Sequence, residues 1–528
     1  MFRPTAIFVE GETLRPSGGD RWVGPGIQVT WRPSQDAADV SADVSADVEV
    51  AASTRVSRIA VRWALPTPPG SLILGDAWER SYGDLQWRHL QPDRFLPWYW
   101  LSHDPVTGRT TGMGVDVQPA AFCSWTVDAD GVTLWLDVRN GGGPVQLGDR
   151  ALTAATIRFF TDAGDPWATL EAAVALMSSR LPARPEPAPA VGANNWYYAY
   201  GVDFDEKAVL KDATTIVELA DGHPVKPFSV VDDGWNPGGP ASGGPWDSGT
   251  PGLFDDMAGT AAAVKEIGAR PGLWFRPLLA RTAGPWGIPG RPERTLDPSR
   301  PEVLDVVRAD LQRFRDWGFE LVKHDFSTYD VFGRFGPAMG ARLTDDGWQL
   351  ADPTRTTAEV ILDFYRVIRD AAGELVLIGC NTVNHLAAGL VDIQRTGDDT
   401  SGRDWERTRR MGVNTLAFRL PQHGRFFTVD ADCVPCTPQT PWSLNRRFLD
   451  LVARSGTALF VSIDPMARTD ETDQDLSAAI RIALDGGDPG GVKPLDWLHN
   501  TTPNDWALSG GTTKYGWSEP WGADPAAG

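Results

Sequence analysis

Acidic side chains follow several runs of apolar, β-type residues in the C-terminal two thirds of the sequence. They are Asp232 with Asp233, Asp325, Asp398 with Asp399, and Asp430 with Asp432. A single acid of this kind could cap a helix, but acids gathered at one site repel one another and need a chemical reason to be there. Two opposed carboxylates can cleave an acetal, since one attacks or stabilises the anomeric carbon while the other protonates the leaving oxygen. Carboxylates that bind a divalent metal are the alternative.

A metal site would be favoured by histidine ligands near these acids. His324 adjoins Asp325 but alternates away from it along a predicted strand, so we expect it to pack against a helix layer. Cys433 and Cys436 form a CxxC without further ligands at tight spacing, and four cysteines in 528 residues do not make a disulfide framework. We therefore expect no metal and no cofactor, with a metal-dependent hydrolase as the weaker alternative.

The pattern after residue 193 must position these acids. Strand-type runs alternate with helical ones: 194–200 then 206–219, 227–232 then 256–269, 272–277 then 301–318, 319–325 then 356–372, 374–380, 390–395 then 403–411, 426–430 then 441–454, and 458–463 then 474–484. This alternation predicts a (β/α)8 TIM barrel, whose site lies at the carboxyl ends of the strands. A doubly wound open sheet is the alternative, but residues 194–201 lack the glycine-rich phosphate loop expected after its first strand.

The front of the chain has a different, β-rich pattern. Short alternating runs such as IQVTWR and VTLWLDV are separated by turn clusters such as SGGD and NGGG, which predicts an N-terminal antiparallel β-sandwich over residues 1–165. Residues 166–192 combine a helix with the run PARPEPAPA and predict a linker. The barrel then covers 193–495, and the turn-rich segment 496–528 is expected to pack on it as a cap or a few strands. The predicted fold class is α/β plus all-β.

Charge and composition indicate which classes of partner and which cellular location to expect. The net charge of −20 disfavours nucleic acid, and no run of about 18 apolar residues that could span a membrane occurs. The start MFRPTAIFVEGETL lacks the basic and apolar regions of a signal peptide, so we expect a soluble, cytoplasmic protein. The 23 tryptophans fit either a Trp-rich core or rings that stack on sugars.

Seven short motifs occur together, and in order, in the barrel segment. They are NNWYYAYG (194–201), FSVVDDGW (228–235), GLWFRP (272–277), LDPSRPEV (296–303), LVKHDF (321–326), QRTGDD (394–399) and SGTALFVSIDP (455–465). On these motifs, residues 194–497 resemble the catalytic barrel of clan D retaining α-glycoside hydrolases, the grouping of the α-galactosidases of families 27 and 36 and their raffinose-synthase-like relatives. A β-sandwich in front of the barrel also fits family 36.

The resemblance implies a catalytic pair. It makes Asp325, in KxD, the nucleophile that forms a covalent glycosyl-enzyme. Lys323 would hold sugar hydroxyls and keep Asp325 ionised, and a plain ion pair between the two is the alternative. Asp398, in RxxD, would be the general acid/base, with Asp399 as the alternative. Arg395 would bind the sugar near its 2- or 3-hydroxyl, or else form a salt bridge with Asp398 or Asp399.

The resemblance also implies a substrate-binding set. Asp232 and Asp233 match carboxylates that hold the 4- and 6-hydroxyls of a terminal galactose, and Trp196 and Trp235 would wall the sugar. The remaining residues expected to bind substrate are Trp274, Arg276, Lys323, Cys380, Asn381, Arg395 and Asp399. Cys380 and Asn381 take the place of a Cys-containing loop over the pocket in family 36.

Three features depart from the family pattern. Arg276 stands in WFRP where family 36 usually has Glu, the CxSGG signature is replaced by GCNTVNH (379–385), and the C-terminal sandwich is missing or reduced to the tail. These departures bear on strict α-galactose specificity and leave the two-acid chemistry in place.

The predicted function is a retaining, exo-acting α-glycoside hydrolase of the α-galactosidase type, acting by double displacement. Its expected partner is an oligosaccharide or glycoside, without nucleic acid or membrane, and a homo-oligomer is compatible with the resemblance. Transglycosylation with a sugar acceptor, or hydrolysis of β-L-arabinopyranosides, α-glucosides or N-acetylated sugars, are the alternatives. A non-catalytic sugar-binding barrel would be expected to lack one of the two acids, and both Asp325 and Asp398 are present.

Overall fold

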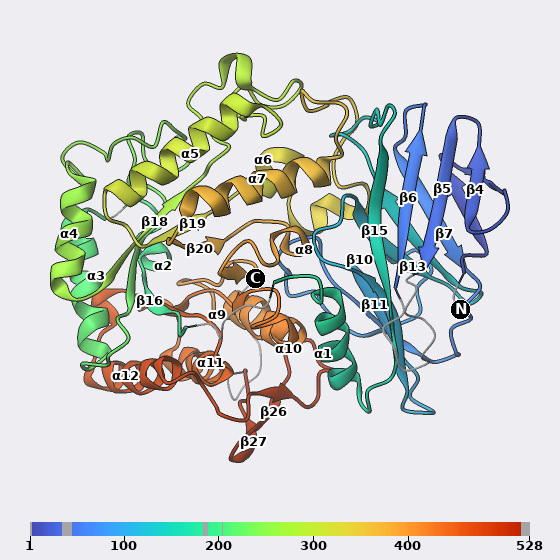
Figure 1. The fold of residues 1–528 in the computed structure, drawn as a ribbon. Coiled ribbons are helices and arrows are strands. Elements are labelled where there is room, and N and C mark those ends of the chain that lie inside the picture. Colours follow the sequence, from blue (N-terminus) through green and yellow to red (C-terminus); the bar gives the residue numbers. More distant parts are fainter. Residues whose placement is uncertain (1–2, 34–44, 183–187, 203, 519–528) are drawn as a thin grey trace.

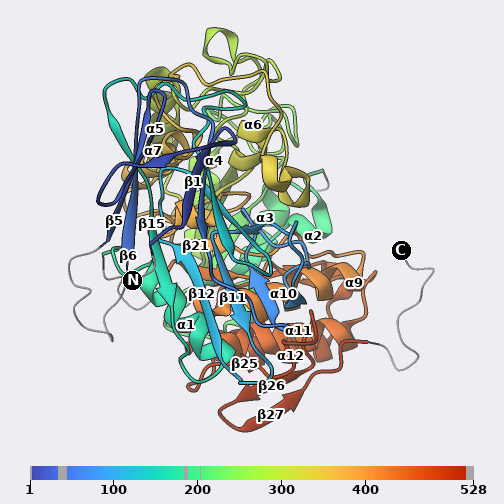
Figure 2. The same ribbon diagram turned by 90° about the vertical axis from the view of Figure 1, so that its right-hand side faces the viewer.

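The computed structural model describes residues 3–33, 45–182, 188–202 and 204–518. An antiparallel β-sandwich forms the N-terminal part, and a parallel barrel wrapped by helices forms the C-terminal part (Figure 1). Seen from the sandwich side, the sheets lie against the barrel along much of its height (Figure 2). This architecture confirms the predicted fold class.

The sandwich consists of two antiparallel sheets. The six-stranded sheet has the order β10-β13-β14-β7-β1-β2, with bounds Leu96–Pro97, Phe122–Val127, Val132–Asp137, Arg58–Trp63, Ala6–Val9 and Glu12–Thr13. The nine-stranded sheet has the order β3-β4-β5-β6-β15-β12-β11-β8-β9, with bounds Arg15–Pro16, Arg21–Gly24, Ile27–Pro33, Ser45–Ala52, Ala151–Phe160, Thr110–Val115, Tyr99–His103, Leu72–Gly75 and Arg88–His89. Alternate residues such as Ile59, Val61 and Trp63 of β7 are buried between the sheets, as the period of two predicts.

Helix α1 (Pro166–Met177) leads from the sandwich toward the barrel. The Asp165 side chain caps it by accepting a hydrogen bond from the Ala168 N–H at 2.8 Å, and proline at the first helical position favours the start. The helix packs on β12 and β15. Part of the expected Pro-rich linker, residues 183–187, lies outside the described residues.

Eight parallel strands form the barrel, and from the first to the seventh each is hydrogen-bonded to the next in chain order. They are β16 (Val191–Asn194), β17 (Phe228–Val231), β18 (Arg270–Phe275), β19 (Leu321–His324), β20 (Val376–Gly379), β21 (Ile393–Arg395), β22 (Thr428–Asp430) and β24 (Leu459–Ile463). β24 pairs with β16, and a bridge between Asp430 and Ala458 closes the ring. The larger covering helices are α3 (Glu206–Leu219), α4 (Met257–Ile267), α5 (Pro301–Asp316), α7 (Thr357–Ala372), α11 (Trp442–Ser455) and α12 (Asp470–Leu484).

Two barrel strands differ from the sequence prediction. The first ends at Asn194, whose side chain accepts a hydrogen bond from the Trp196 N–H at 2.9 Å, so that residues Trp196–Ala199 form the short helix α2 instead of continuing the strand. The seventh strand is interrupted, because Asp432 has a left-handed backbone (φ 78°), and it resumes as β23 (Val434–Cys436) beside β24.

The helical segment after β21 is also broken more finely than predicted. It begins as α9 (Trp405–Thr408), passes through a π-helical turn (Arg409–Val413) and continues as α10 (Asn414–Arg419). Shorter helices follow other barrel strands, namely α6 (Ser327–Phe332) and α8 (Asn384–Ala387).

The C-terminal tail packs on the rest of the molecule through a small sheet and several tryptophans. The sheet comprises β25 (Lys493–Pro494), β26 (Asp505–Leu508) and β27 (Gly511–Lys514). Trp497 packs against Trp87, Trp167 and Phe418 with ring centroids 5.4 Å apart in each pair. Residues 519–528 lie outside the described part of the chain.

Most tryptophans are core residues, so the structure favours the simpler explanation of their number. Trp22, Trp63, Trp98, Trp125, Trp274 and Trp506, for example, are almost completely buried. Trp135 and Trp286 are the more exposed exceptions, at 43% and 40%. No helix among the described residues is long and apolar enough to cross a membrane.

Candidate active site

The two acids expected to do chemistry lie at one end of the barrel. Asp325 directly follows β19, and Asp398 follows β21 after two residues. β20 pairs with both strands in parallel, so the carboxyl ends of all three meet at the same edge. With one strand between them, β19 and β21 lie about 10 Å apart. Asp232 and Asp233 follow β17 at this same edge.

Two N–H donors fix the Asp325 carboxylate. The Trp274 indole Nε1–H donates to Oδ2 at 3.0 Å, and the Phe326 backbone N–H donates to Oδ1 at 2.7 Å. Trp274 lies on the adjacent strand β18 in register with Lys323, which brings its ring edge to the end of β19. Asp325 is 7% exposed, so its carboxylate is held in place and largely withdrawn from solvent.

Lys323 pairs with Asp232 and not with Asp325. Its ammonium donates to Asp232 Oδ2 at 2.6 Å, and the Asn194 amide donates to the same oxygen at 2.6 Å. Burial is the largest single influence on the pKa of Lys323 and lowers it, but the nearby negative groups, Asp232 first among them, together hold the pKa above its ordinary value. The Lys323–Asp325 ion pair, which was the alternative to sugar binding, is therefore absent from the contacts of these two described residues, and Lys323 instead holds Asp232 at the end of β17.

Asp233 has an unused hydrogen-bonding oxygen. Its Oδ2 accepts from the Ala241 N–H at 3.2 Å, whereas its buried Oδ1 has no partner among the described residues. Burial, assisted by the negative charge of Asp232, raises the pKa of Asp233 to about 7. A buried polar atom without a partner is costly, so Asp233 is suited to hydrogen-bond a ligand.

Arginines lie close to both Asp398 and Asp399, but the pKa values of the two acids shift in opposite directions. Arg407 contacts Asp398 at 2.6 Å and Arg80 contacts it at 3.2 Å. Burial nevertheless raises the pKa of Asp398, with the Asp399 charge acting in the same direction. Burial also disfavours the charge of Asp399, but Arg395 and Arg80, each 3.0 Å away, hold its pKa at about 2. Asp398 is thus the better proton donor of the two.

The sandwich supplies Arg80 to this site, a contribution that the sequence interpretation missed. Arg80 lies in the segment after β8. Its neighbour Ser81 forms a β-bridge with the segment that follows β21. The Ser81 N–H donates to Thr396 O at 2.8 Å, and the Asp398 N–H donates to Ser81 O at 2.8 Å. The backbone of the sandwich therefore extends the pairing of β21 and fixes the position of Asp398.

Glu79 anchors the same sandwich segment. This fully buried carboxylate accepts hydrogen bonds from the Tyr82 hydroxyl at 2.7 Å and from the Gly336 N–H at 2.8 Å. The Asn381 amide, oriented to satisfy both neighbours, donates to Glu79 at 3.0 Å and accepts from Arg80 at 2.9 Å. Asn381 is therefore brought to the site, where it contacts the sandwich segment.

Arg395 forms salt bridges, which was the alternative to sugar binding. It contacts Asp432 at 2.9 Å as well as Asp399, and its Nη1 lies 3.8 Å from the Cys380 sulfur. Its Nε has no hydrogen-bond partner among the described residues. The interruption of the seventh strand is what turns the Asp432 carboxylate toward Arg395. Cys380 itself is buried next to this guanidinium.

Trp235 does not line the site, so its expected role as a wall is wrong. It is completely buried, and its indole N–H donates to Trp274 O at 2.8 Å. Its ring packs against Phe314 of α5 and the neighbouring Trp317. Gly234 has φ 115°, and this turn directs Trp235 into the helix layer. Trp196 remains partly exposed beside Tyr200, with ring centroids 5.9 Å apart.

Trp274 and Arg276 position other groups. Trp274 is 1% exposed and offers only its N–H edge to Asp325. Arg276 forms a buried ion pair with Asp330, donating from Nε at 3.0 and 3.1 Å, and its guanidinium lies 4.4 Å from the Phe326 ring centroid. Burial lowers the pKa of Arg276, but Asp330 and the nearby Asp325 raise it above its ordinary value.

The structure gives no support for metal binding by His324. As predicted, the imidazole packs in the helix layer, against Phe275, Phe364 and Tyr365. Burial lowers the pKa of His324 to about 3. No group of three or more His, Cys, Asp and Glu side chains within the described ranges is arranged to hold a metal ion.

No family model and no curated protein matches the sequence. The fold is similar to several solved structures. One is the α-galactosidase TtGalA from Thermus thermophilus in complex with p-nitrophenyl α-D-galactopyranoside, with a TM-score of 0.60, 18% identity, and coverage of 97% of this chain and 99% of that chain. Another is the GH36 α-galactosidase AgaA from Geobacillus stearothermophilus, with a TM-score of 0.59, 14% identity, and coverage of 91% and 75%. The resemblance to family 36 is thereby confirmed as one of fold.

Proposed function

We propose that this protein is a retaining, exo-acting α-glycoside hydrolase of the α-galactosidase type. The observation that carries the proposal is the placement of Asp325 and Asp398 at one edge of the barrel, one strand apart. The fold similarity to α-galactosidases adds support. The different surroundings of the two acids also support it, because double displacement needs one ionised and one protonated carboxyl group.

In the proposed first step, a carboxylate oxygen of Asp325 attacks the anomeric carbon. The bond from this carbon to the leaving oxygen breaks, and that oxygen takes the proton of Asp398. In the second step, water gives a proton to Asp398 while its oxygen attacks the anomeric carbon and displaces Asp325. The raised pKa of Asp398 favours the protonated start, whereas the pKa of Asp399, about 2, makes Asp399 a poor donor.

The sugar would be held from the β17 side of the site. Asp232, Asp233 and Lys323 form a cluster at this edge, and Asp233 Oδ1 is free to accept from, or when protonated donate to, a sugar hydroxyl. The acceptor-rich end of β17 suits the 4- and 6-hydroxyls of a terminal galactose. Arg276, in contrast, forms an ion pair with Asp330, and we infer that it positions Asp330 and does not bind the sugar.

The test is a panel of p-nitrophenyl glycosides followed by NMR of the released sugar. The α-D-galactoside is expected to be the preferred substrate, with β-L-arabinopyranoside, α-D-glucoside and α-N-acetylgalactosaminide as competitors, and the α-anomer is expected to appear first. Added acceptor sugars distinguish hydrolysis from transglycosylation. Release of the β-anomer first, or no turnover of any glycoside in the panel, would rule the proposal out.

Asp325→Ala identifies the nucleophile. Its turnover is expected to fall by at least about 10³-fold, and azide is expected to restore release of p-nitrophenol as a glycosyl azide forms. Asp310→Asn is the matched control, because Asp310 is a buried, ion-paired aspartate on the outer helix α5. Near-normal activity of Asp325→Ala would show that another group attacks the sugar.

A further inference from the structure

Three hollows form a continuous track across the sandwich. The outermost, of about 470 Å³, is lined by residues of β1, β7 and β14, including Phe8, Ala60 and Trp135. A second, of about 260 Å³, shares Arg58 and Trp135 with the first. The third, of about 380 Å³, shares Trp78, Asp93 and Phe95 with the second. Each hollow therefore touches the next.

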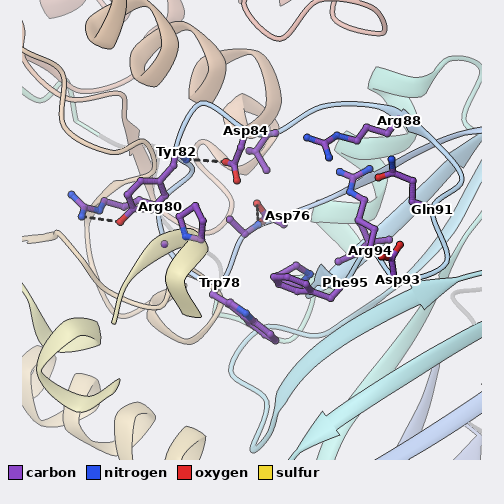
Figure 3. Close-up of a pocket in the computed structure, with 16 residues that line it drawn as sticks. Asp76, Trp78, Arg80, Tyr82, Asp84, Arg88, Gln91, Asp93, Arg94 and Phe95 are labelled. Atoms are coloured by element: carbon purple, nitrogen blue, oxygen red, sulfur yellow. Dashed lines mark hydrogen bonds between the residues drawn. The ribbon is translucent and has the colours of Figure 1, made fainter. Parts of the chain in front are cut away.

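The inner end of the track reaches the segment that holds Asp398. The third hollow is lined by Arg80 and Tyr82 as well as by Arg88 and Arg94. Figure 3 shows that the Arg80 side chain points away from Arg88 and Arg94, on the side of the segment that faces the barrel. Its guanidinium contacts Asp398 at 3.2 Å. One segment thus separates the track from the candidate active site.

The outer end of the track is built as an aromatic platform. Trp135 and Phe8 both lie opposite Ala60 on the outer face of the six-stranded sheet, so two strand spacings, about 10 Å, separate them across a small residue. Trp135 is 43% exposed, and its indole N–H donates to Thr126 Oγ1 at 2.9 Å. That bond holds the large ring in place over the sheet.

The charged groups beside the aromatic platform, Arg58 and Glu10, already have partners. Arg58 contacts Asp137 at 3.3 Å, and Glu10 accepts from the backbone N–H groups of Ser57 and Arg58. The molecule as a whole carries a net charge of −20. A polyanion would be repelled, whereas aromatic faces with neutral hydroxyl groups between them, such as those of Ser124 and Thr126, suit the C–H faces and hydroxyls of sugars.

We propose that this track binds a neutral glycan chain of several sugar units and leads it toward the barrel. The proposal rests on the proposed function for the nature of the substrate, and it adds a second, non-catalytic binding surface on the sandwich. Continuity with the Arg80 segment, and the aromatic platform whose charged neighbours Arg58 and Glu10 already have partners, favour a glycan over a protein partner. A second copy of this chain on the same face is the competing occupant, and the experiment separates the two.

The test is affinity electrophoresis of the full chain in native gels containing soluble galactomannan. The Asp325→Asn variant is used so that the polymer is not cleaved, and excess galactose occupies the candidate barrel site. Retardation under these conditions is expected, and Trp135→Ala in the same background is expected to weaken it by about threefold to tenfold. Val106→Ala is the control, because Val106 is 86% exposed on the sandwich and lies outside the three hollows.

The outcomes distinguish this proposal from the proposed function. The glycan track is overturned if the Asp325→Asn chain is not retarded, or if Trp135→Ala leaves the retardation unchanged. Hydrolysis of p-nitrophenyl glycosides by the wild-type chain is a separate measurement and tests the proposed function alone. Sedimentation velocity reports the competing occupant: a dimer that Trp135→Ala converts to a monomer would make this face a subunit interface. Trp135→Tyr, which keeps a ring at this position, is expected to give intermediate retardation, and a thermal melt checks that each variant is folded.

Discussion

The two ends of the candidate site are built from different parts of the chain. Asp325 is held by Trp274 and by the Phe326 N–H, both within the barrel. Asp398 is held by both parts of the chain, by the sandwich through the Arg80 guanidinium and the Ser81 backbone and by the barrel through Arg407 of α9. The described contacts of the proposed nucleophile therefore lie within the barrel, whereas those of the proposed acid come partly from the sandwich.

The electrostatic surroundings differ in the same way. Asp325 is in contact with neutral N–H donors only, among the contacts described for its carboxylate. Asp398 lies between Arg80, Arg407 and the negative Asp399, and its pKa is raised because burial and Asp399 together outweigh the two arginines. Changes near Asp325 are thus expected to alter rate, and changes near Asp398 to alter the pH dependence as well.

The largest effect is expected when the acid itself is removed. Asp398→Asn should lower kcat/KM by about 10²- to 10⁴-fold for a glycoside with an alkyl leaving group, because the leaving oxygen then receives no proton. The loss should be much smaller for a p-nitrophenyl glycoside, which leaves without help. Steady-state kinetics with both substrates measures the difference, and equal losses would argue against Asp398 as the acid.

Removal of the sandwich arginine comes next. Arg80→Ala should lower kcat/KM by about 10- to 100-fold, since Asp398 loses a partner that fixes its position. Arg80 favours the ionised form of Asp398, so its loss raises the pKa of Asp398 and moves the basic limb of the kcat/KM profile to higher pH.

Arg32→Ala is the matched control, because Arg32 pairs with Glu49 at 2.7 Å on an exposed part of the sandwich. An unshifted basic limb in Arg80→Ala would show that Arg80 only stabilises the fold.

Loss of the indole N–H should reduce the rate to a similar extent, but without moving the basic limb. Trp274→Phe keeps the ring in its buried position but removes the donor to Asp325 Oδ2. A hydrogen bond to a charged group contributes about 1.5–3 kcal/mol, so a fall in kcat of about tenfold to 100-fold is expected, while the basic limb of the kcat/KM profile, which belongs to Asp398, stays in place. A shifted basic limb would contradict the division between the two ends.

The smallest expected change is a shift of pH dependence. Asp399→Asn removes a negative charge that raises the pKa of Asp398, so the basic limb of kcat/KM should move to lower pH, opposite in sign to Arg80→Ala. The two variants measured over the same pH range check the comparison directly. Shifts of the same sign would mean that the titrating group is not Asp398.

Local patterns in the sequence were enough to predict the barrel. The buried strands β17 (FSVV) and β24 (LFVSI) are mostly apolar runs, and α3 begins at an N-cap aspartate and ends where its apolar spacing ends. The same patterns placed Asp325 at a strand end. They could not reveal that β16 stops at Asn194, since this depends on one side chain that folds back on the backbone.

Contacts between distant residues explain the rest of what was missed. Arg80 and Asp399 are 319 residues apart, and no local pattern in the sandwich indicates that the segment after β8 enters the barrel end. The partner of Lys323 could not be chosen either, because Asp232 and Asp325 both follow strands, β17 and β19, that end at the same side of the barrel. Trp235 was misassigned because the turn at Gly234 reverses the direction that simple alternation gives to the next side chain.

The hydrogen bonds of Ser81 limit how this architecture can change during evolution. A side-chain contact can be exchanged for another by single substitutions, but a backbone pairing depends on the path of both segments. One residue added to or lost from the segment after β8 would turn Arg80 to the opposite side of the ladder formed with residues 396–398. Insertions and deletions in this segment are therefore expected to be selected against. Joining the barrel to an unrelated sandwich would also require new contacts to hold Asp398 in position.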